Sequence, residues 1–291
     1  MKNFKIQNAI VIICFLVGVN AFGQTYQEVP GRFPTRNIAE EIRDHHSGLA
    51  VWWTGHNGWL IKSGDTLVST DLVLETEEDR LYDPPVSAAE IAADLDIAFI
   101  THEHGDHFSR ATSRILLEKS DCIFVMPETC LEAARELGIP EIRIRIATPR
   151  DSFKVKGVKV KALRAIHGNP KFAVFYNANL QDCGYLITLG GKDFLQPGDT
   201  VLLEDHLFLK HVDVLFFSPT EHNMHIQQSV LLINELAPDY ILPQHRNTFR
   251  VTDQNRYWTT AYAHEVKMYL SKPLRKNRYH ILNHGEKLEI R

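Results

Sequence analysis

The sequence predicts an α/β fold built of packed layers, in which strands and helices alternate along the chain. An apolar run over residues 97–100 has the composition of a buried strand, and a helical pattern follows it over residues 109–117. The next segments continue the alternation, with a strand over 122–126, a helix over 127–137 and a strand over 142–146. Alternation of this kind is typical of layered α/β domains.

The first residues have the features of an export signal. Lys2 and Lys5 give a positive start, residues 9–19 form a short apolar core, and Ala21-Phe22-Gly23 provides a cleavage site. The apolar core is too short to span a bilayer comfortably. We expect residues 1–23 to be removed as a signal peptide, which predicts a periplasmic or secreted protein without a stable membrane span. Retention of this segment as an anchor is the alternative.

The remaining residues, 24–291, are expected to form one domain. Removal of residues 1–23 from the 291-residue chain leaves 268 residues, and no linker, repeat or low-complexity stretch divides them. The removed segment holds two lysines and no acid, so the formal charge changes from −4 to −6. An acidic chain argues against nucleic acid as a partner, because such binding needs a concentrated basic surface. We expect a small-molecule substrate, and the sequence predicts no oligomeric state.

The domain begins with three predicted strands that form an antiparallel meander. They cover residues 49–53, 59–62 and 66–70, and turns rich in Gly, Asn and Asp separate them. Asp71 stands at the end of the third strand. A proline-rich turn follows, and Ser87-Ala88-Ala89-Glu90 then has the pattern of a helix start.

A histidine-rich loop stands where the central strand gives way to a helix. Its residues are Thr101-His102-Glu103-His104-Gly105-Asp106-His107. Alternate residues of an extended segment face the same way, so His102, His104 and Asp106 can converge while His107 points to the other side. Imidazole and carboxylate ligands suit zinc, iron or manganese, and ligand sites of layered α/β folds gather at this end of the strands. The loop therefore predicts two neighbouring metal positions, and a merely polar turn is the alternative.

The Thr-His-x-His-x-Asp-His pattern resembles the main metal motif of the metallo-β-lactamase superfamily of binuclear metallohydrolases. This resemblance implies a four-layer αββα sandwich, with two mixed sheets flanked by helices. The segment from Trp53 to Ile61, Trp-x-Gly-His-x-x-x-Leu-Ile, is similar to the ascorbate-6-phosphate lactonase-like branch, which includes the phospholipase D that acts on N-acyl-phosphatidylethanolamine. The chain departs from that branch at Leu72, where a proline is usual, and at Asn57, where serine or alanine is usual.

The superfamily's remaining metal ligands have matching positions further along the chain. His167 closes the strand predicted over residues 155–165, Asp199 follows Gly198 after a short strand at 194–195, and His245 follows the strand at 240–243. The resemblance implies that His102, His104 and His167 hold one metal as a three-imidazole set. It also implies that Asp106, His107 and His245 hold the second metal, with Asp199 bridging the two.

Two further residues are expected to support these ligands. By its position, Asp71 should lie beneath the metal loop and hydrogen-bond to it, as carboxylates near metal ligands commonly do. His56 is expected either to contact a ligand or to make a structural hydrogen bond. His222 and His225 could line the pocket, but no motif assigns them as ligands.

Several other elements complete the predicted domain. Strands are expected over residues 172–177, 184–188 and 212–217, a helix over 227–236, an amphipathic segment over 253–270 and a hairpin-like end over 279–290. Three cysteines remain after signal removal, and we expect them to be buried thiols, although Cys122 and Cys130 could pair.

The chemistry that the resemblance implies is hydrolysis by a metal-bridging hydroxide, which would cleave an ester, lactone or phosphodiester bond. Asp106 would help to orient that nucleophile, and no Gly-x-Ser-x-Gly elbow or P-loop occurs in the sequence. The metals are expected to be two divalent ions, zinc first and manganese or iron next. The alternatives are a metal-dependent β-lactam or amide hydrolase and a non-catalytic metal-binding relative.

Overall fold

The computed structural model describes residues 33–75, 79–176 and 178–291, all of which fall in one compact unit. The predicted signal segment, residues 1–23, lies outside the described residues. No helix within the described ranges is long and apolar enough to cross a membrane.

The first sheet has seven strands in the order β15-β1-β2-β3-β4-β5-β6. The strands β15, β1, β2 and β3 pair antiparallel, and β3 to β6 pair parallel. The antiparallel meander predicted at the start of the domain is therefore confirmed. The bounds are β1 Leu49–Gly55, β2 Gly58–Ser63, β3 Thr66–Thr70, β4 Leu95–Phe99, β5 Ile123–Pro127, β6 Ile144–Ala147 and β15 Lys287–Ile290.

The second sheet has six strands in the order β14-β13-β12-β11-β8-β7. It repeats the mixed design of the first, because β7, β8, β11 and β12 pair antiparallel whereas β12, β13 and β14 pair parallel. The bounds are β7 Ser152–Val155, β8 Val158–Arg164, β11 Cys183–Leu189, β12 Lys192–Gln196, β13 Val214–Phe217 and β14 Tyr240–Pro243. A separate two-stranded ribbon is formed by β9 Gly168–Asn169 and β10 Val174–Phe175.

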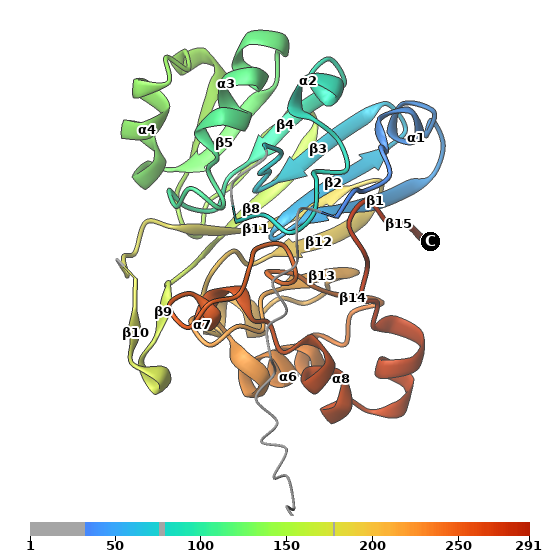
Figure 1. The fold of residues 1–291 in the computed structure, drawn as a ribbon, viewed down its shortest axis with the longest axis vertical. Helices are drawn as coiled ribbons and strands as arrows, with labels where there is room; N and C mark the ends of the chain where they lie inside the picture. The colour runs from blue at the N-terminus through green and yellow to red at the C-terminus, as the bar shows by residue number, and fades with distance from the viewer. Residues whose placement is uncertain (1–32, 76–78, 177) are drawn as a thin grey trace, which may run out of the picture. The chain divides into compact units, whose positions relative to one another are not determined.

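Helices cover the outer face of each sheet. Figure 1 shows α2, α3 and α4 over the first sheet and α6 and α8 over the second. The helices are α1 Ala39–Arg43, α2 Ala88–Ile91, α3 Arg110–Lys119, α4 Leu131–Glu136, α5 Glu204–Leu207, α6 His225–Leu236, α7 Arg256–Thr259 and α8 Ala263–Tyr269. Short helical turns occupy Glu128–Cys130, Glu141–Arg143, Pro170–Phe172 and Leu274–Arg278. Ser87 and Glu90 cap α2 reciprocally, as the sequence pattern predicted.

Three buried apolar layers hold the sandwich together. Successive side chains of a strand point to opposite faces, so Trp52 packs beneath the helices of the first sheet while Trp53 packs between the two sheets. In the same way Phe216 faces the layer between the sheets and Phe217 the layer beneath α6 and α8. Two sheets with helices on both outer faces form the predicted αββα architecture.

Some predicted elements are wrong in detail. The strand expected over 155–165 is a hairpin of β7 and β8, because Lys156 and Gly157 both adopt positive φ, at 44° and 83°, and make a tight turn. The strand expected over 172–177 is interrupted at Ala173, where φ is 54°, and only β10 remains, outside the second sheet. The expected end hairpin is also wrong, because Tyr279 pairs with Ile241 and β15 joins the first sheet.

The three cysteines in the described residues are free and buried. Cys122, Cys130 and Cys183 therefore do not form a disulfide, and burial raises the pKa of each thiol.

Protonation of buried His206 is expected to lower the stability of the folded protein in mild acid. Its ring is fully buried in α5, and Nδ1 accepts a hydrogen bond of 3.1 Å from the backbone N–H of Leu203. Burial lowers the pKa of His206 to about 4, below the unfolded value, so its contribution is complete above pH 6.5 and is lost toward pH 4. We expect unfolding free energy to fall by about 2 kcal/mol between pH 7.5 and 5 from this residue.

The His206→Asn variant tests this expectation, because asparagine can accept the same hydrogen bond but does not titrate. Urea unfolding of both proteins at pH 7.5 and pH 5 should show a weaker pH dependence in the variant. Identical pH dependence in the two proteins would contradict the assignment.

Candidate metal centre

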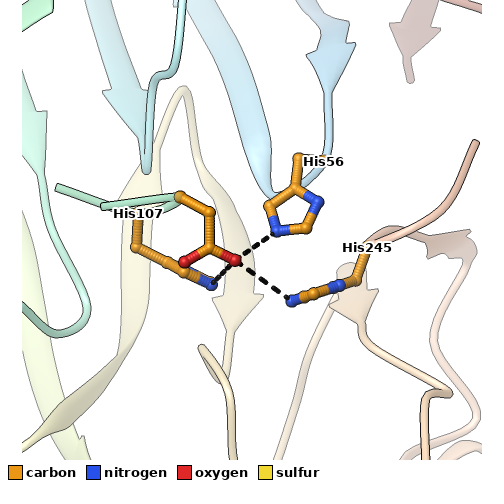
Figure 2. Close-up of side chains that lie close together, drawn as sticks. His56, His107 and His245 are labelled. Carbon is orange, nitrogen blue, oxygen red and sulfur yellow. Dashed lines mark hydrogen bonds and ion pairs between the residues drawn. The ribbon is translucent and has the colours of Figure 1, made fainter. Parts of the chain in front are cut away.

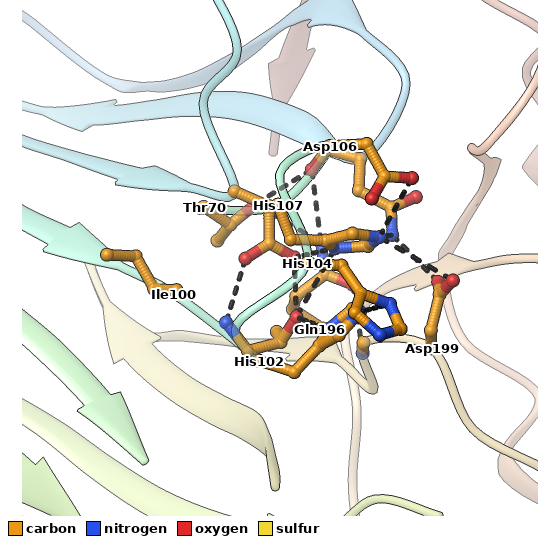
Figure 3. A network of polar contacts seen from close by, with 12 residues as sticks. Thr70, Ile100, His102, His104, Asp106, His107, Gln196 and Asp199 are labelled. Carbon is orange, nitrogen blue, oxygen red and sulfur yellow. Dashed lines mark hydrogen bonds and ion pairs between the residues drawn. The ribbon is translucent and has the colours of Figure 1, made fainter. Parts of the chain in front are cut away.

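The predicted metal-binding residues all follow strand ends. The loop 101–107 follows β4, His167 follows β8, Asp199 follows β12 and His245 follows β14. Figure 3 shows the loop side chains and Asp199 turned toward one another from the two sheets. The hydroxyl of Tyr185, on β11, donates to the carbonyl of Ile100 at 2.7 Å and so ties the second sheet to the start of the loop.

His102, His104 and His167 form a first group. One ring nitrogen of each lies within 4.8 Å of those of the others. His102 Nε2 and His104 Nδ1 are 3.1 Å apart, and both ring nitrogens of buried His167 have no hydrogen-bond partner among the described residues. A buried imidazole nitrogen without a hydrogen-bond partner is unfavourable, and a cation bound among these three rings would accept one nitrogen lone pair from each of them. These three residues, which the resemblance assigns to one metal, therefore lie together in the structure.

Asp106, His107 and His245 form a second group, and His56 lies among them. Figure 2 shows the imidazoles of His56, His107 and His245 pointing toward one carboxylate. That carboxylate is Asp106, whose Oδ2 is 2.8 Å from His56 Nε2, 3.8 Å from His107 Nε2 and 3.9 Å from His245 Nε2. His56 therefore contacts a predicted ligand directly.

Asp199 lies between the two groups. Its Oδ2 is 3.0 Å from His245 Nε2, 3.4 Å from His167 Nε2 and 3.5 Å from His107 Nε2. Gly198 allows this approach, because its φ is +69° and a Cβ there would lie 2.8 Å from Thr101 Cβ. One carboxylate oxygen thus faces imidazoles of both groups, which is the arrangement needed for a bridging ligand.

Asp71 lies beneath the metal loop. Its Oδ1 accepts a hydrogen bond of 2.8 Å from the Thr101 N–H, and its Oδ2 accepts from the Thr101 hydroxyl at 2.9 Å. The same Oδ2 lies 3.0 Å from His107 Nδ1. With Nδ1–H donating to this carboxylate, Nε2 is the His107 nitrogen left to bind a metal, once it has lost its own proton.

The backbone is strained at three of these residues. His56, Asp71 and His245 have φ values of 51°, 42° and 57°, in the left-handed region that non-glycine residues rarely adopt. Each such residue costs about 1–3 kcal/mol and persists only where its surroundings hold it. His245 N–H donates to the His56 carbonyl at 2.9 Å, so two of the strained residues hold each other.

The electrostatics favour neutral imidazoles in the first group. Burial lowers the pKa of His102, and the nearby His107 and His167 lower it further. Burial and His167 lower the pKa of His104 to about 4. These rings are therefore unprotonated at neutral pH, which is the state that binds a metal.

Asp199 and His107 carry charges in the metal-free centre, in contrast to the imidazoles of the first group. Burial alone would raise the pKa of Asp199, but His245 and His107 hold it well below its usual range. Burial alone would lower the pKa of His107, but Asp199 and Asp106 hold it well above its usual range. The metal-free centre thus keeps ionised carboxylates around one protonated imidazole, and a divalent cation could replace that proton.

His222 belongs to the same cluster, although no motif assigned it. Its Nε2 lies 2.8 Å from Asp199 Oδ2, and it forms a further metal-capable group with His167 and Asp199. His225 does not join, because its ring packs against Phe172 and Tyr262. One sequence signal for His222 existed: it follows the end of a buried strand, β13, as His167 and His245 follow theirs.

Asn57, a departure from the lactonase-like branch, also faces the centre. Its buried amide donates to Asp199 Oδ1 at 3.0 Å and accepts from the Ser218 hydroxyl at 3.3 Å. The amide therefore fixes the second oxygen of Asp199 while the first faces the imidazoles.

Replacement of Asn57 by leucine is expected to weaken metal binding by roughly 10-fold, because Asp199 would lose the donor that orients it. Asn57→Ser should weaken binding less, because a hydroxyl can still donate. The measurement is metal affinity, determined by competition with a chromogenic chelator. Thermal unfolding checks that the variants are folded. Equal affinity in the leucine variant and the parent would show that Asn57 does not orient Asp199.

A cavity of about 350 Å³ opens onto the centre. It is lined by His104, Gly105, Asp106, His167, Tyr176, Asp199, His222 and Trp258. Residues of both metal-capable groups therefore reach a space large enough for a small molecule.

Comparison with known proteins agrees with this architecture. A family model described as "Beta-lactamase superfamily domain" matches residues 50–245. A Desulforamulus reducens protein named "UPF0173 metal-dependent hydrolase" is 27% identical over 250 residues, which cover 83% of this chain and 100% of that protein.

Two solved structures are similar in fold. The metallo hydrolase Igni18 from Ignicoccus hospitalis has a TM-score of 0.64 at 18% identity, covering 82% of this chain and 97% of that chain. The metallo-β-lactamase fold protein YhfI from Bacillus subtilis has a TM-score of 0.58 at 15% identity, covering 83% and 99%. The four-layer fold of the metallo-β-lactamase type, predicted from the sequence, is confirmed.

Proposed function

The chain belongs to the β-lactamase superfamily, whose domain model matches residues 50–245, and on that basis we propose that it is a hydrolase that depends on two divalent metal ions. The observation that carries this proposal is the convergence of two imidazole-rich groups on Asp199. The name of the Desulforamulus reducens relative, a metal-dependent hydrolase, supports the same function.

We assign the first metal to His102, His104 and His167 and the second to Asp106, His107 and His245, with Asp199 shared. His56 orients Asp106 through the 2.8 Å contact of its Nε2. Nitrogen and oxygen ligands without thiolate fit zinc, manganese or iron, and the affinity order favours zinc when it is available.

The bound ions would supply Lewis acidity, which polarises the scissile group and acidifies a water molecule at neutral pH. The protein's own groups would then control position and protons. Asp106, held by His56 and exposed to the cavity, would accept a hydrogen bond from the attacking water. His222 lies at the cavity wall with its Nε2 2.8 Å from Asp199 Oδ2, where an N–H at Nε2 can donate to that carboxylate and hold it in place.

The substrate is proposed to be a small molecule with an ester, lactone or phosphodiester bond, following the resemblance of residues 53–61 to the lactonase-like branch. Hydrolysis of a β-lactam or another amide is the second candidate.

We propose a periplasmic or secreted enzyme, and this part of the proposal rests on the sequence of residues 1–23 alone. The mass of the protein recovered after expression tests cleavage, because an uncleaved anchor would keep residues 1–23.

The test begins with metal analysis of the purified protein, followed by a hydrolase panel on the same sample. The panel contains lactones, bis-p-nitrophenyl phosphate and a cephalosporin. We expect about two metals per chain and turnover that a chelator abolishes and added metal restores. Fewer than one metal per chain after reconstitution would refute the seven-ligand assignment.

Asp106→Ala separates an enzyme from a non-catalytic metal-binding relative. The variant should lose turnover while its fold is retained, because a group that orients the attacking water is missing. Glu103→Ala is a matched control, since Glu103 lies exposed in the same loop. Full turnover in Asp106→Ala would contradict the proposed role.

A further inference from the structure

Two aromatic side chains form the cavity wall beside the candidate metal centre. Tyr176 stacks on His167, with ring centroids 4.8 Å apart and planes 13° from parallel. Trp258 lies on the other group, with its ring edge-on to His56 at 6.0 Å and to His245 at 6.3 Å. One aromatic wall therefore stands beside each candidate metal position.

Hydrogen bonds hold these walls in place. The Tyr176 hydroxyl is hydrogen-bonded to the hydroxyl of Tyr257, which precedes Trp258 in α7. The Tyr257 carbonyl lies 3.2 Å from His222 Nδ1. The hydroxyl of Tyr176 is thus already engaged, and its ring is the part of the side chain left for a ligand.

Within the part of the chain that the structure describes, the cavity lining offers no cationic side chain that could pair with an anionic substituent of a substrate. Among the described residues that line it, none is lysine or arginine. Two divalent ions would place their positive charge at the centre itself, where the scissile group would bind, and the acidic side chains that line the cavity are Asp106 and Asp199. An additional carboxylate or phosphate on the substrate would meet acidic groups and aromatic rings.

We propose that the cavity binds an uncharged substrate whose apolar ring or chain lies between Tyr176 and Trp258, such as an alkyl- or aryl-substituted lactone or ester. Cleavage of that substrate rests on the proposed hydrolase function, but its binding does not. A short alkyl chain buried against the two rings should improve affinity by roughly 10- to 100-fold.

Tryptophan fluorescence offers a local probe of this binding. The chain has four tryptophans. Trp52, Trp53 and Trp59 are buried in the core, whereas Trp258 lines the cavity. A ligand in the cavity should therefore change the emission of Trp258, and the change should disappear in Trp258→Phe.

The experiment titrates the zinc-loaded protein with two cyclopentanones, ring ketones that resemble lactones but cannot be hydrolysed. One carries a butyl group and the other a carboxyethyl group of similar length. We expect the butyl compound to bind at least 10-fold more tightly. Equal or tighter binding of the carboxyethyl compound would overturn the proposal.

Variants of Tyr176 test whether its ring contributes to binding of the butyl compound. Tyr176→Ala should weaken binding of the butyl compound by about 10-fold, and Tyr176→Phe should rescue it because the ring is restored. Tyr269→Ala is the control, since Tyr269 is exposed and lies outside this cavity. Unchanged affinity in Tyr176→Ala would remove Tyr176 from the site.

The two proposals fail in different ways. Selective binding of the butyl compound without metal-dependent turnover of any ester, lactone, phosphodiester or β-lactam would refute the hydrolase and leave this inference standing. Metal-dependent turnover without the binding preference would refute this inference and leave the hydrolase standing.

Discussion

Replacement of Asp199 by alanine is expected to reduce turnover by at least about 1000-fold, which corresponds to roughly 4 kcal/mol of transition-state stabilisation. The physical reason is the position of its Oδ2, which faces His222, His245, His167 and His107 at 2.8–3.5 Å. Without this carboxylate, no shared ligand would lie between the two cations to offset their repulsion, because Asp106 belongs to the second group alone. We expect metal content to fall from about two ions per chain to one or none.

A matched set of variants makes this result interpretable. Asp199→Asn keeps the shape of the side chain but not its charge, so it should also lose metal while unfolding at a similar temperature. Asp193→Ala is the control, because Asp193 lies on the same strand β12 and its carboxylate accepts from Thr188, away from the centre. Two bound metals and parental turnover in Asp199→Ala would exclude a bridging role.

The resemblance of the metal loop to a known superfamily predicted the layers and the seven ligand positions, and the local order of the sequence is consistent with both. A buried strand shows as an apolar run, and its end is marked by the polar residues that follow it, as at His167 and His245. Parallel strands bring their ends to one edge, so residues far apart in sequence were expected to meet there. The fold and the two metal-capable groups agree with that logic.

The residues that sequence reasoning missed act through contacts that only the tertiary fold creates. Asn57 and Asp199 are 142 positions apart, and nothing near either residue signals the hydrogen bond between them. Gln196 and Gln244 exchange two amide hydrogen bonds, of 3.0 and 2.7 Å, in a buried site between the ends of β12 and β14. Figure 3 shows Gln196 beside the loop residues. A glutamine is usually solvent-exposed, so its sequence position alone predicts the surface.

Turn geometry limited the prediction of the elements themselves. The β7–β8 turn at Lys156-Gly157 and the break at Ala173 both depend on positive φ values. Gly157 is a turn signal in the sequence, whereas alanine at position 173 gives none. The same is true of His56 and His245, whose left-handed backbone is held by a hydrogen bond between the two loops. Strain of this kind is a property of the assembled centre.

The second large effect is expected at Asp71, which does not line the cavity beside the centre but hydrogen-bonds to the metal loop. Its carboxylate accepts from the Thr101 N–H, from the Thr101 hydroxyl and from His107 Nδ1. In Asp71→Asn the amide can donate to His107 Nδ1, which would move the ring proton to Nε2 and block the lone pair that binds the second metal. We expect metal affinity at that position to fall by roughly 10- to 100-fold.

Competition with a chromogenic chelator should resolve this loss as one weakened metal and one nearly unchanged metal, because His102, His104 and His167 do not contact Asp71 directly. Thr101→Val supplies the comparison. It removes the Thr101 hydroxyl, which donates to Asp71 and also lies 3.0 Å from His102 Nδ1 and 3.4 Å from His107 Nδ1, but it leaves the contact between Asp71 and His107 Nδ1 intact. A smaller loss in Thr101→Val than in Asp71→Asn would identify tautomer control as the cause. Equal losses would instead mean that Asp71 acts by holding the loop, and unchanged affinity in both would show that the centre does not need either contact.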